Sequence, residues 1–137
     1  VGQNMIEDRL LEEETGSIIV VLATDAPLSG FALKQIAKRV AIGVGRGGSP
    51  GGNNSGDIFL AFSVANERPM PGQDDVVIDK KELNSKFIDP LYLAAVQTVE
   101  EAVINALVAG EDVDTVKPKG VTCKAINTAK LAQLFEQ

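Results

Sequence analysis

The sequence of 137 residues contains no histidine. This absence removes the commonest general base, the commonest metal ligand and the usual activator of a serine nucleophile, so a Ser-His-Asp triad cannot be built from this chain. Cys123 is the only cysteine, which excludes an intrachain disulfide and a zinc site of several thiolates. No loop spaces its acidic residues for Mg²⁺ or Ca²⁺. We therefore expect no metal and no other cofactor. The apolar stretch VTCKAI favours a small packing role for Cys123 over a reactive thiol.

Basic residues, aromatic residues and long apolar runs are also scarce. There are 13 Lys and Arg against 19 Asp and Glu, a net charge of −6, which argues against nucleic acid and anionic membranes as partners. Five Phe and one Tyr are too few for a base-stacking platform. No apolar run approaches the roughly 20 residues of a membrane helix, and the acidic N-terminus is unlike a signal peptide. We expect a cytoplasmic protein. A periplasmic location stays open as the alternative, because the sequence begins with Val1 rather than Met.

The apolar runs that are present predict two buried strands in a single domain. SIIVVLA, from Ser17 to Ala23, and DIFLAFSVAN, from Asp57 to Asn66, are rich in Ile, Val, Leu and Phe, with little alternation of apolar and polar residues. Such strands are typically buried on both faces. The sequence therefore predicts a layered α/β architecture. VVI, at 76–78, predicts a third, short strand.

Three segments have the apolar spacing or end signals of helices. The first covers 28–44. The second begins with Asp89 as its N-cap and Pro90 as its first residue, and Gly110 closes it. The third follows Asn127, with Leu131, Leu134 and Phe135 packing inward.

A glycine-rich segment, GVGRGGSPGGNNSG at 43–56, predicts a loop. It contains the G-x-G-x-x-G pattern, but a dinucleotide site needs that pattern to follow a strand and to open a helix. Here the pattern follows a helix, so we expect no nucleotide to bind.

The junction of Gly16 and Ser17 suggests a nucleophile that needs no histidine. Glycine leaves its carbonyl sterically open, and a stiff strand can hold a side chain at its end in a defined position. Attack of the Ser17 hydroxyl on the Gly16 carbonyl would shift the acyl group from nitrogen to oxygen, and water would then release a new N-terminus. The freed α-amine, with a reference pKa of about 8, could accept the hydroxyl proton. The alternative is a plain strand-entry serine.

Ser55 and Asp57 precede the second strand. On an extended backbone, residues two apart point to the same side. A hydroxyl and a carboxylate on one side could form a short relay that orients Ser17, provided that the two strands are neighbours. A strand-entry turn is the alternative explanation of these residues.

GSIIVVLATDAPL and NNSGDIFLAFSVAN, together with the helix from Asp89 and the C-terminal AINTAKLAQLF, resemble the L-aminopeptidase/D-Ala-esterase-amidase family, which includes the β-peptidyl aminopeptidases. The resemblance extends from Gly16 nearly to the end of the chain. It implies a self-cleaving precursor with a four-layer αββα sandwich, assembled as an oligomer of heterodimers. It also implies a metal-free hydrolase that releases N-terminal residues from peptides, amides or esters.

Carried over onto this sequence, the resemblance implies that Ser17 is the nucleophile and that Ser55 and Asp57 support it. Some members have Glu where this chain has Asp57. The resemblance also implies that residues 1–16 are the end of the large N-terminal subunit and that residues 17–137 are the small catalytic subunit, one α/β domain. Because the family's large subunit supplies the oxyanion hole, we expect this chain alone to be inactive or nearly so.

Two further interpretations remain open at the level of sequence. One is a non-catalytic α/β binding or assembly module in which Ser17 is structural. The other is a related acyltransferase, because an acyl-serine can be relieved by an amine as well as by water.

Overall fold

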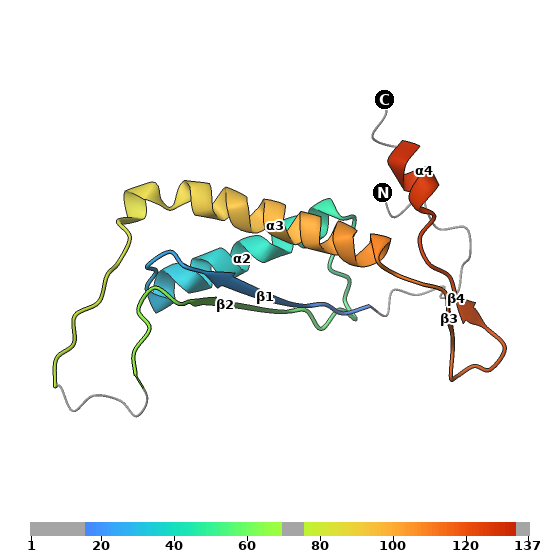
Figure 1. Cartoon of the computed structure of the whole chain (residues 1–137), viewed down its shortest axis with the longest axis horizontal. Helices are drawn as coiled ribbons and strands as arrows, with labels where there is room; N and C mark the ends of the chain where they lie inside the picture. Colours follow the sequence, from blue (N-terminus) through green and yellow to red (C-terminus); the bar gives the residue numbers. More distant parts are fainter. Residues whose placement is uncertain (1–15, 70–75, 134–137) are drawn as a thin grey trace.

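Two parallel strands and two long helices form the body of the structure, a computed structural model that describes residues 16–69 and 76–133 (Figure 1). β1 (Ile19–Thr24) and β2 (Ile58–Ser63) pair in parallel, with Ile19 opposite Ile58. α2 (Gly30–Arg46) lies between them in sequence, as parallel pairing requires of a crossover. α3 (Asp89–Val108) packs beside α2. The predicted α/β class is confirmed.

α2 begins where the sequence supplies a cap. The Ser29 hydroxyl oxygen accepts a hydrogen bond from the Ala32 N–H at 3.4 Å, which satisfies one of the free donors of the first turn. The helix then continues through Gly43 and Gly45 to Arg46, so the glycine-rich loop begins at Gly47 rather than at Gly43. The predicted loop start was therefore wrong, because packing of α2 against α3 outweighs the weak helix propensity of glycine.

The helices cover one face of the sheet. Val40, Val44 and Val99 form a buried cluster, against which the partly buried Val20 and Phe59 pack. A second cluster of Leu28, Ile36 and Ala95 continues the core toward the other end of the strands. The core therefore lies between the α2–α3 layer and the alternate strand residues that point toward it.

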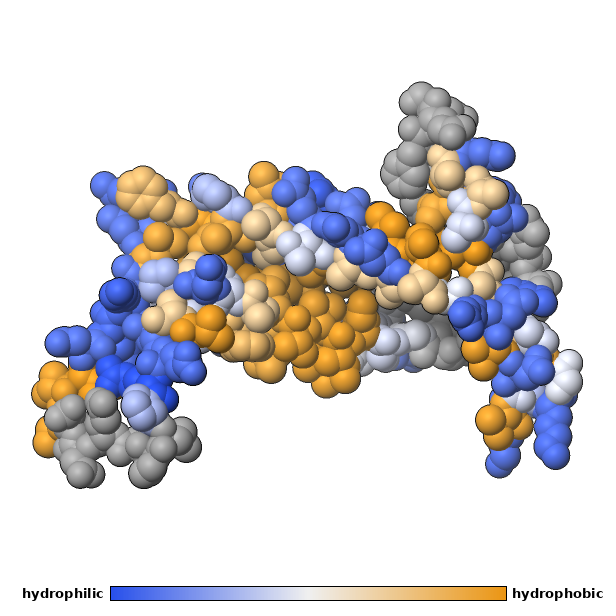
Figure 2. All heavy atoms as spheres, in the orientation of Figure 1, coloured by the Kyte–Doolittle hydropathy of each residue, from blue (hydrophilic) through white to orange (hydrophobic). Residues whose placement is uncertain are grey.

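The opposite face of the two strands is exposed, contrary to the prediction of burial on both faces. Its apolar side chains gather over β1 and β2 in Figure 2. Ile19 is 70 % exposed and Leu60 is 55 % exposed. We call this surface the open apolar face, and its members are Ile19, Val21, Ile58, Leu60 and Phe62. An apolar run has the same composition whether helices of this chain or another segment covers its second face, so sequence could not distinguish the two.

α3 starts and ends near the predicted residues, but its cap differs. Asp89 is the first helical residue, and Ile88 occupies the cap position without a side-chain hydrogen bond. The short 3₁₀ turn η1 (Ser85–Phe87) runs directly into the helix, which replaces the predicted cap. At the other end, the Gly110 N–H donates to the Leu107 carbonyl at 3.2 Å.

By length and composition alone, α3 is the one helix among the described residues that could cross a membrane, with a mean hydropathy of 1.3. The packing of α3 in the core also explains why this helix is apolar. Val96 and Val99 are buried in the core. Near its middle, the Glu100 carboxylate binds the Arg46 guanidinium at 3.2 Å. These contacts place α3 in the helix layer over the sheet.

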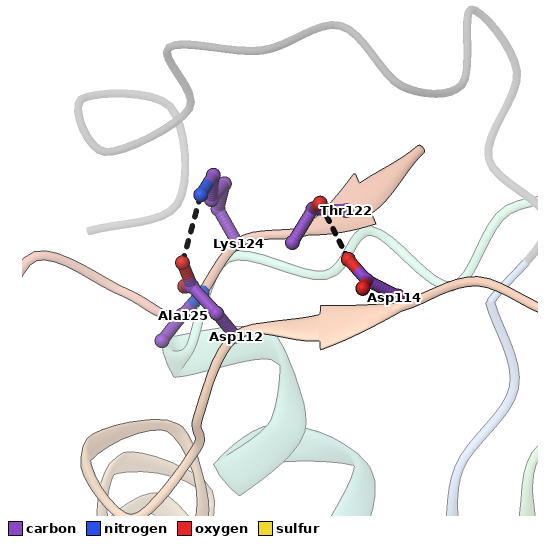
Figure 3. A network of polar contacts seen from close by, with 5 residues as sticks. All are labelled: Asp112, Asp114, Thr122, Lys124 and Ala125. Atoms are coloured by element: carbon purple, nitrogen blue, oxygen red, sulfur yellow. Dashed lines mark hydrogen bonds and ion pairs between the residues drawn. The ribbon is translucent and has the colours of Figure 1, made fainter. Parts of the chain in front are cut away.

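A small antiparallel hairpin follows α3. β3 (Val113–Asp114) pairs with β4 (Thr122–Cys123), and polar contacts join the two sides, with Thr122 donating to Asp114 and Lys124 to Asp112 (Figure 3). Cys123 is exposed there, so the prediction of a packing role was wrong. Apolar residues lie within two or three positions of Cys123, but its direct neighbours Thr122 and Lys124 make polar contacts, and the two-residue strand β4 leaves Cys123 exposed.

Two other predictions concern the remaining segments. Residues 76–78 form a bend rather than a strand, and Val76 and Val77 are almost fully exposed, so no neighbouring strand stabilises them. α4 (Thr128–Gln133) follows Asn127 as predicted, with Leu131 buried. Leu134 and Phe135 lie outside the described residues.

Candidate active site

Ser17 lies directly before β1, and the Ser55–Asp57 segment lies directly before β2. Because the strands are parallel, their starts meet at the same edge of the sheet. The register that pairs Ile19 with Ile58 brings Ile18 opposite Asp57 and Ser17 opposite Gly56 when it is continued backwards. The strand neighbourhood on which the predicted relay depends is therefore present.

The Asp57 carboxylate connects the two strand starts. Its Oδ1 atom accepts a hydrogen bond from the Ile18 backbone N–H at 3.1 Å and another from the Ser55 hydroxyl at 2.5 Å. The Ser55–Asp57 contact confirms that the two side chains lie on the same side, as their spacing predicts. The carboxylate fixes β1 at the residue that follows Ser17.

Gly56, between these two residues, makes the polar contact with Ser17. Its backbone N–H donates to the Ser17 Oγ at 3.0 Å. The sequence analysis missed Gly56, because a backbone donor leaves no mark in the residue pattern. The only signal that could have found it is register, since a parallel pairing of the two apolar runs aligns Gly56 with Ser17. Direct contact between the Ser55 and Ser17 hydroxyls stays a prediction.

The three predicted residues line one cavity of about 230 Å³. Ser17 is exposed at this site, whereas Ser55 and Asp57 are half-buried, in step with the alternation of exposed and covered residues along each strand. The rest of the wall comes from the two residues that flank Ser17, from α2 and α3, and from the loop after α2. These lining residues are Gly16, Ile18, Val44, Gly47, Ser49 and Val103.

A larger space, of about 570 Å³, lies beyond the other end of β2, between residues 65–69 and 77–81. The described residues that line it include charged side chains but no serine, threonine or cysteine. This space is the larger of the two, but the smaller cavity is the one lined by serine side chains and therefore the better candidate for a serine nucleophile. Within residues 16–69 and 76–133, no group of three or more acidic or cysteine side chains is placed to hold a metal ion.

The arrangement is suited to nucleophilic attack by a serine oxygen. The Ser17 Oγ accepts one hydrogen bond from a backbone donor, so its own proton remains available for transfer to a base. The neighbouring peptide group is held through Ile18 by a carboxylate. The Gly16–Ser17 peptide bond lies at the same cavity, because both of its residues contribute to the wall.

Comparison with known proteins relates this chain to serine aminopeptidases. Residues 1–121 match peptidase family S58. A β-peptidyl aminopeptidase of Sphingosinicella microcystinivorans is 42 % identical over 122 residues, which are 89 % of this chain and 30 % of that protein. A structure of the L-aminopeptidase D-Ala-esterase/amidase from Ochrobactrum anthropi, a prototype of the serine aminopeptidases and a variant of the Ntn hydrolase fold, superposes with a TM-score of 0.85. It is 46 % identical, with 99 % of this chain and 37 % of that one covered.

A Burkholderia β-aminopeptidase gives a TM-score of 0.78 at 36 % identity, covering 89 % of this chain and 35 % of that one. The chain thus spans about a third of the length of the solved relatives and 30 % of the first curated one. The likeness confirms the resemblance seen in the sequence and the fold class that it implied. With most of its length matched and Ser17 at the start of a strand in an Ntn-type fold, the chain belongs to peptidase family S58.

Proposed function

We propose that this chain is the nucleophile-bearing part of an N-terminal-serine hydrolase that cuts itself at Gly16–Ser17. The mature enzyme then releases N-terminal residues from peptides, amides or esters. One observation carries the proposal: Ser17 lies at the start of β1 with its Oγ bound by the Gly56 N–H, in a cavity shared with Ser55 and Asp57. The activities named for the relatives, β-peptidyl aminopeptidase and L-aminopeptidase D-Ala-esterase/amidase, indicate the substrate class.

In the maturation step, the Ser17 Oγ attacks the Gly16 carbonyl carbon. The Oγ–C bond forms, the C–N bond breaks, and the hydroxyl proton ends on the Ser17 nitrogen, which becomes a free amine. Water then adds to the ester carbon and displaces Oγ, so Gly16 leaves as a carboxylic acid and Ser17 recovers its hydroxyl. Ser17 then has both its nucleophile and a base on one residue.

In turnover, the α-amine of Ser17 takes the hydroxyl proton as Oγ attacks the substrate carbonyl, and it returns that proton to the leaving amine or alcohol. Water resolves the acyl-serine with the same amine as base. Ser55 and Asp57 hold this end of β1 in place, since Asp57 binds the Ile18 N–H next to the new N-terminus. No histidine is required at any step.

The partner in this proposal is the large N-terminal segment of the same precursor, which ends with residues 1–16, while residues 17–137 form the small subunit. The open apolar face supports this assignment, because five large apolar side chains on one sheet face form a surface suited to a second sheet. Such packing completes the αββα sandwich. By the same resemblance we propose an oligomer of heterodimers. Separately, we propose a cytoplasmic location, with the periplasm as the alternative.

The test is intact-mass measurement of the purified full-length precursor. The unchanged precursor should yield a fragment whose first residue is Ser17, and Ser17→Ala should remain a single chain. Ser49→Ala is the matched control, because Ser49 lines the same cavity and should leave cleavage intact. Cleavage of the Ser17→Ala precursor at this bond would refute the proposal.

A further inference from the structure

We propose that the backbone N–H of Gly56 is a catalytic group that stabilises the charge on the Ser17 Oγ during attack and release. This inference rests on the proposed function and extends it. The sequence pattern assigned the supporting role to the side chains on either side of Gly56. The structure instead places the backbone N–H between those side chains against the nucleophile, at 3.0 Å.

The position of this N–H follows from the parallel ladder. From β2 toward β1, the Ile58 N–H donates to the Ile18 carbonyl at 2.9 Å and the Val64 N–H donates to the Thr24 carbonyl at 3.0 Å. The same ladder, continued two residues before Ile58, would direct the Gly56 N–H to the Gly16 carbonyl. The Gly56 N–H donates instead to the Ser17 Oγ. The Gly56 N–H, which a continuous sheet would use for a backbone hydrogen bond, therefore donates to the reacting oxygen instead.

The two flanking side chains hold this N–H in place. Asp57 accepts the Ile18 N–H at 3.1 Å, which fixes β1 against β2 one residue away from Gly56. Ser55 donates to the same carboxylate oxygen and so ties the preceding backbone to it. In this arrangement Ser55 and Asp57 are positioning residues for the Gly56 N–H as well as for the strand start.

The chemical effect depends on charge at Oγ. As the hydroxyl proton leaves and before the Oγ–C bond is complete, negative charge on Oγ rises, and a fixed N–H donor stabilises it. On deacylation, the C–Oγ bond breaks and Oγ departs with the electron pair before it regains a proton. The same N–H stabilises the oxygen at that moment. The donor needs no rearrangement, because the ladder already fixes it.

The test removes one N–H and changes little else. Gly56→glycolic acid, introduced into the full-length precursor by nonsense suppression, replaces the amide by an ester. Val64→2-hydroxyisovaleric acid is the matched control, because it removes an N–H from the other end of the same ladder.

We expect the ester at Gly56 to slow self-cleavage roughly 10- to 100-fold, below the 10²–10³ of a full oxyanion donor because Oγ bears only part of the charge. In the mature enzyme, kcat should fall with KM unchanged, while the thermal midpoint equals that of the Val64 ester.

Equal rates for the two ester variants, whether both fast or both slow, would overturn the role of Gly56. A slower Gly56 ester with a raised KM and unchanged kcat would also overturn it, because that result indicates substrate positioning. Ser17→Ala distinguishes failure of the proposed function from failure of this inference. Cleavage of the Ser17→Ala precursor would refute the proposed function itself. If Ser17→Ala is not cleaved while the Gly56 ester cleaves at the unmodified rate, only this inference is refuted.

Discussion

Gly43 of α2 lies so close to Val96 of α3 that a Cβ atom on Gly43 would come within 2.7 Å of the Val96 carbonyl oxygen and 2.8 Å of the Val99 Cβ. The two helices therefore approach each other through a glycine. Val44 of α2 and Val103 of α3 both line the candidate active-site cavity, so the two helices that meet at Gly43 also form part of its wall.

Gly43→Ala should therefore destabilise the protein by roughly 1–3 kcal/mol, because the new methyl group meets backbone that cannot move away easily. Gly45→Ala is the matched control on the same helix, since a Cβ there meets nothing within 4 Å. It should be neutral or stabilise by up to about 1 kcal/mol, the helix-propensity difference between the residues. Urea unfolding of both variants in the full-length protein measures the difference, and equal midpoints would contradict the close contact.

Asp57→Ala should slow self-cleavage more than Asp57→Asn. The asparagine keeps an oxygen that accepts from the Ile18 N–H, whereas alanine leaves that donor and the Ser55 hydroxyl without their present acceptor. The alanine variant should also lose roughly 1–3 kcal/mol of unfolding free energy. Asp114→Ala removes a comparable carboxylate–hydroxyl contact in the hairpin and should leave the cleavage rate unchanged. Gel-based cleavage kinetics compare the three, and an unaffected Asp57→Ala would exclude the positioning role.

Activity of the mature enzyme should rise with pH through the pKa of the Ser17 α-amine, whose reference value is about 8. The direction follows because only the neutral amine accepts a proton. Burial lowers that pKa by disfavouring the ammonium, and the nearby Asp57 carboxylate raises it by stabilising the ammonium. Selective blocking of the α-amine, with the hydroxyl left free, should abolish turnover. Full activity after that modification would place the base elsewhere.

Leu60→Asp should prevent assembly of the full-length protein and reduce self-cleavage, because it places a charge at the centre of the open apolar face. Leu60 is 55 % exposed there. Phe31→Asp is the control, since Phe31 is 74 % exposed on α2, outside that face, and should be tolerated. Size-exclusion chromatography and intact mass report assembly and cleavage. Normal assembly of Leu60→Asp would show that the face is not a contact surface.

The Asp112 carboxyl should titrate below its usual pKa of 3.8, because the hydrogen bond from Lys124 and that from the Ala125 N–H hold its pKa down (Figure 3). A depressed folded-state pKa contributes stability above the ordinary value, and that contribution is lost as the pH falls through the folded-state pKa. Lys124→Met should raise the pKa of Asp112, measured by NMR titration. Lys119→Met, in the same hairpin, should leave it unchanged, and an identical Asp112 midpoint in Lys124→Met would contradict the assignment.

The sequence predicted those parts of the fold and site that depend on side-chain type. Apolar runs marked both strands, apolar spacing marked α2 and α3, and the missing histidine pointed to Ser17 at a Gly-Ser junction. The spacing of Ser55 and Asp57 correctly predicted a shared side.

Features that depend on backbone geometry or on a second layer were not predictable in this way. The role of Gly56 comes from a peptide N–H, which every residue except proline has. The exposed side of β1 and the exposure of Cys123 depend on which segments cover them. The helical position of Gly43 was not predictable because the close approach to α3, which favours glycine there, is a tertiary contact.

The hydrogen bond from Gly56 to the Ser17 Oγ joins residues 39 positions apart in the chain. A newly made polypeptide has Ser17 long before it has the donor, and it gains that contact only when β1 and β2 align in the correct register. Under the proposed mechanism, the protein therefore cannot cut itself efficiently while it is unfolded or misaligned by one residue. Because cleavage is irreversible, each cleaved chain is one in which this pair of strands formed correctly. The cleaved fraction therefore measures the fraction of molecules that have folded.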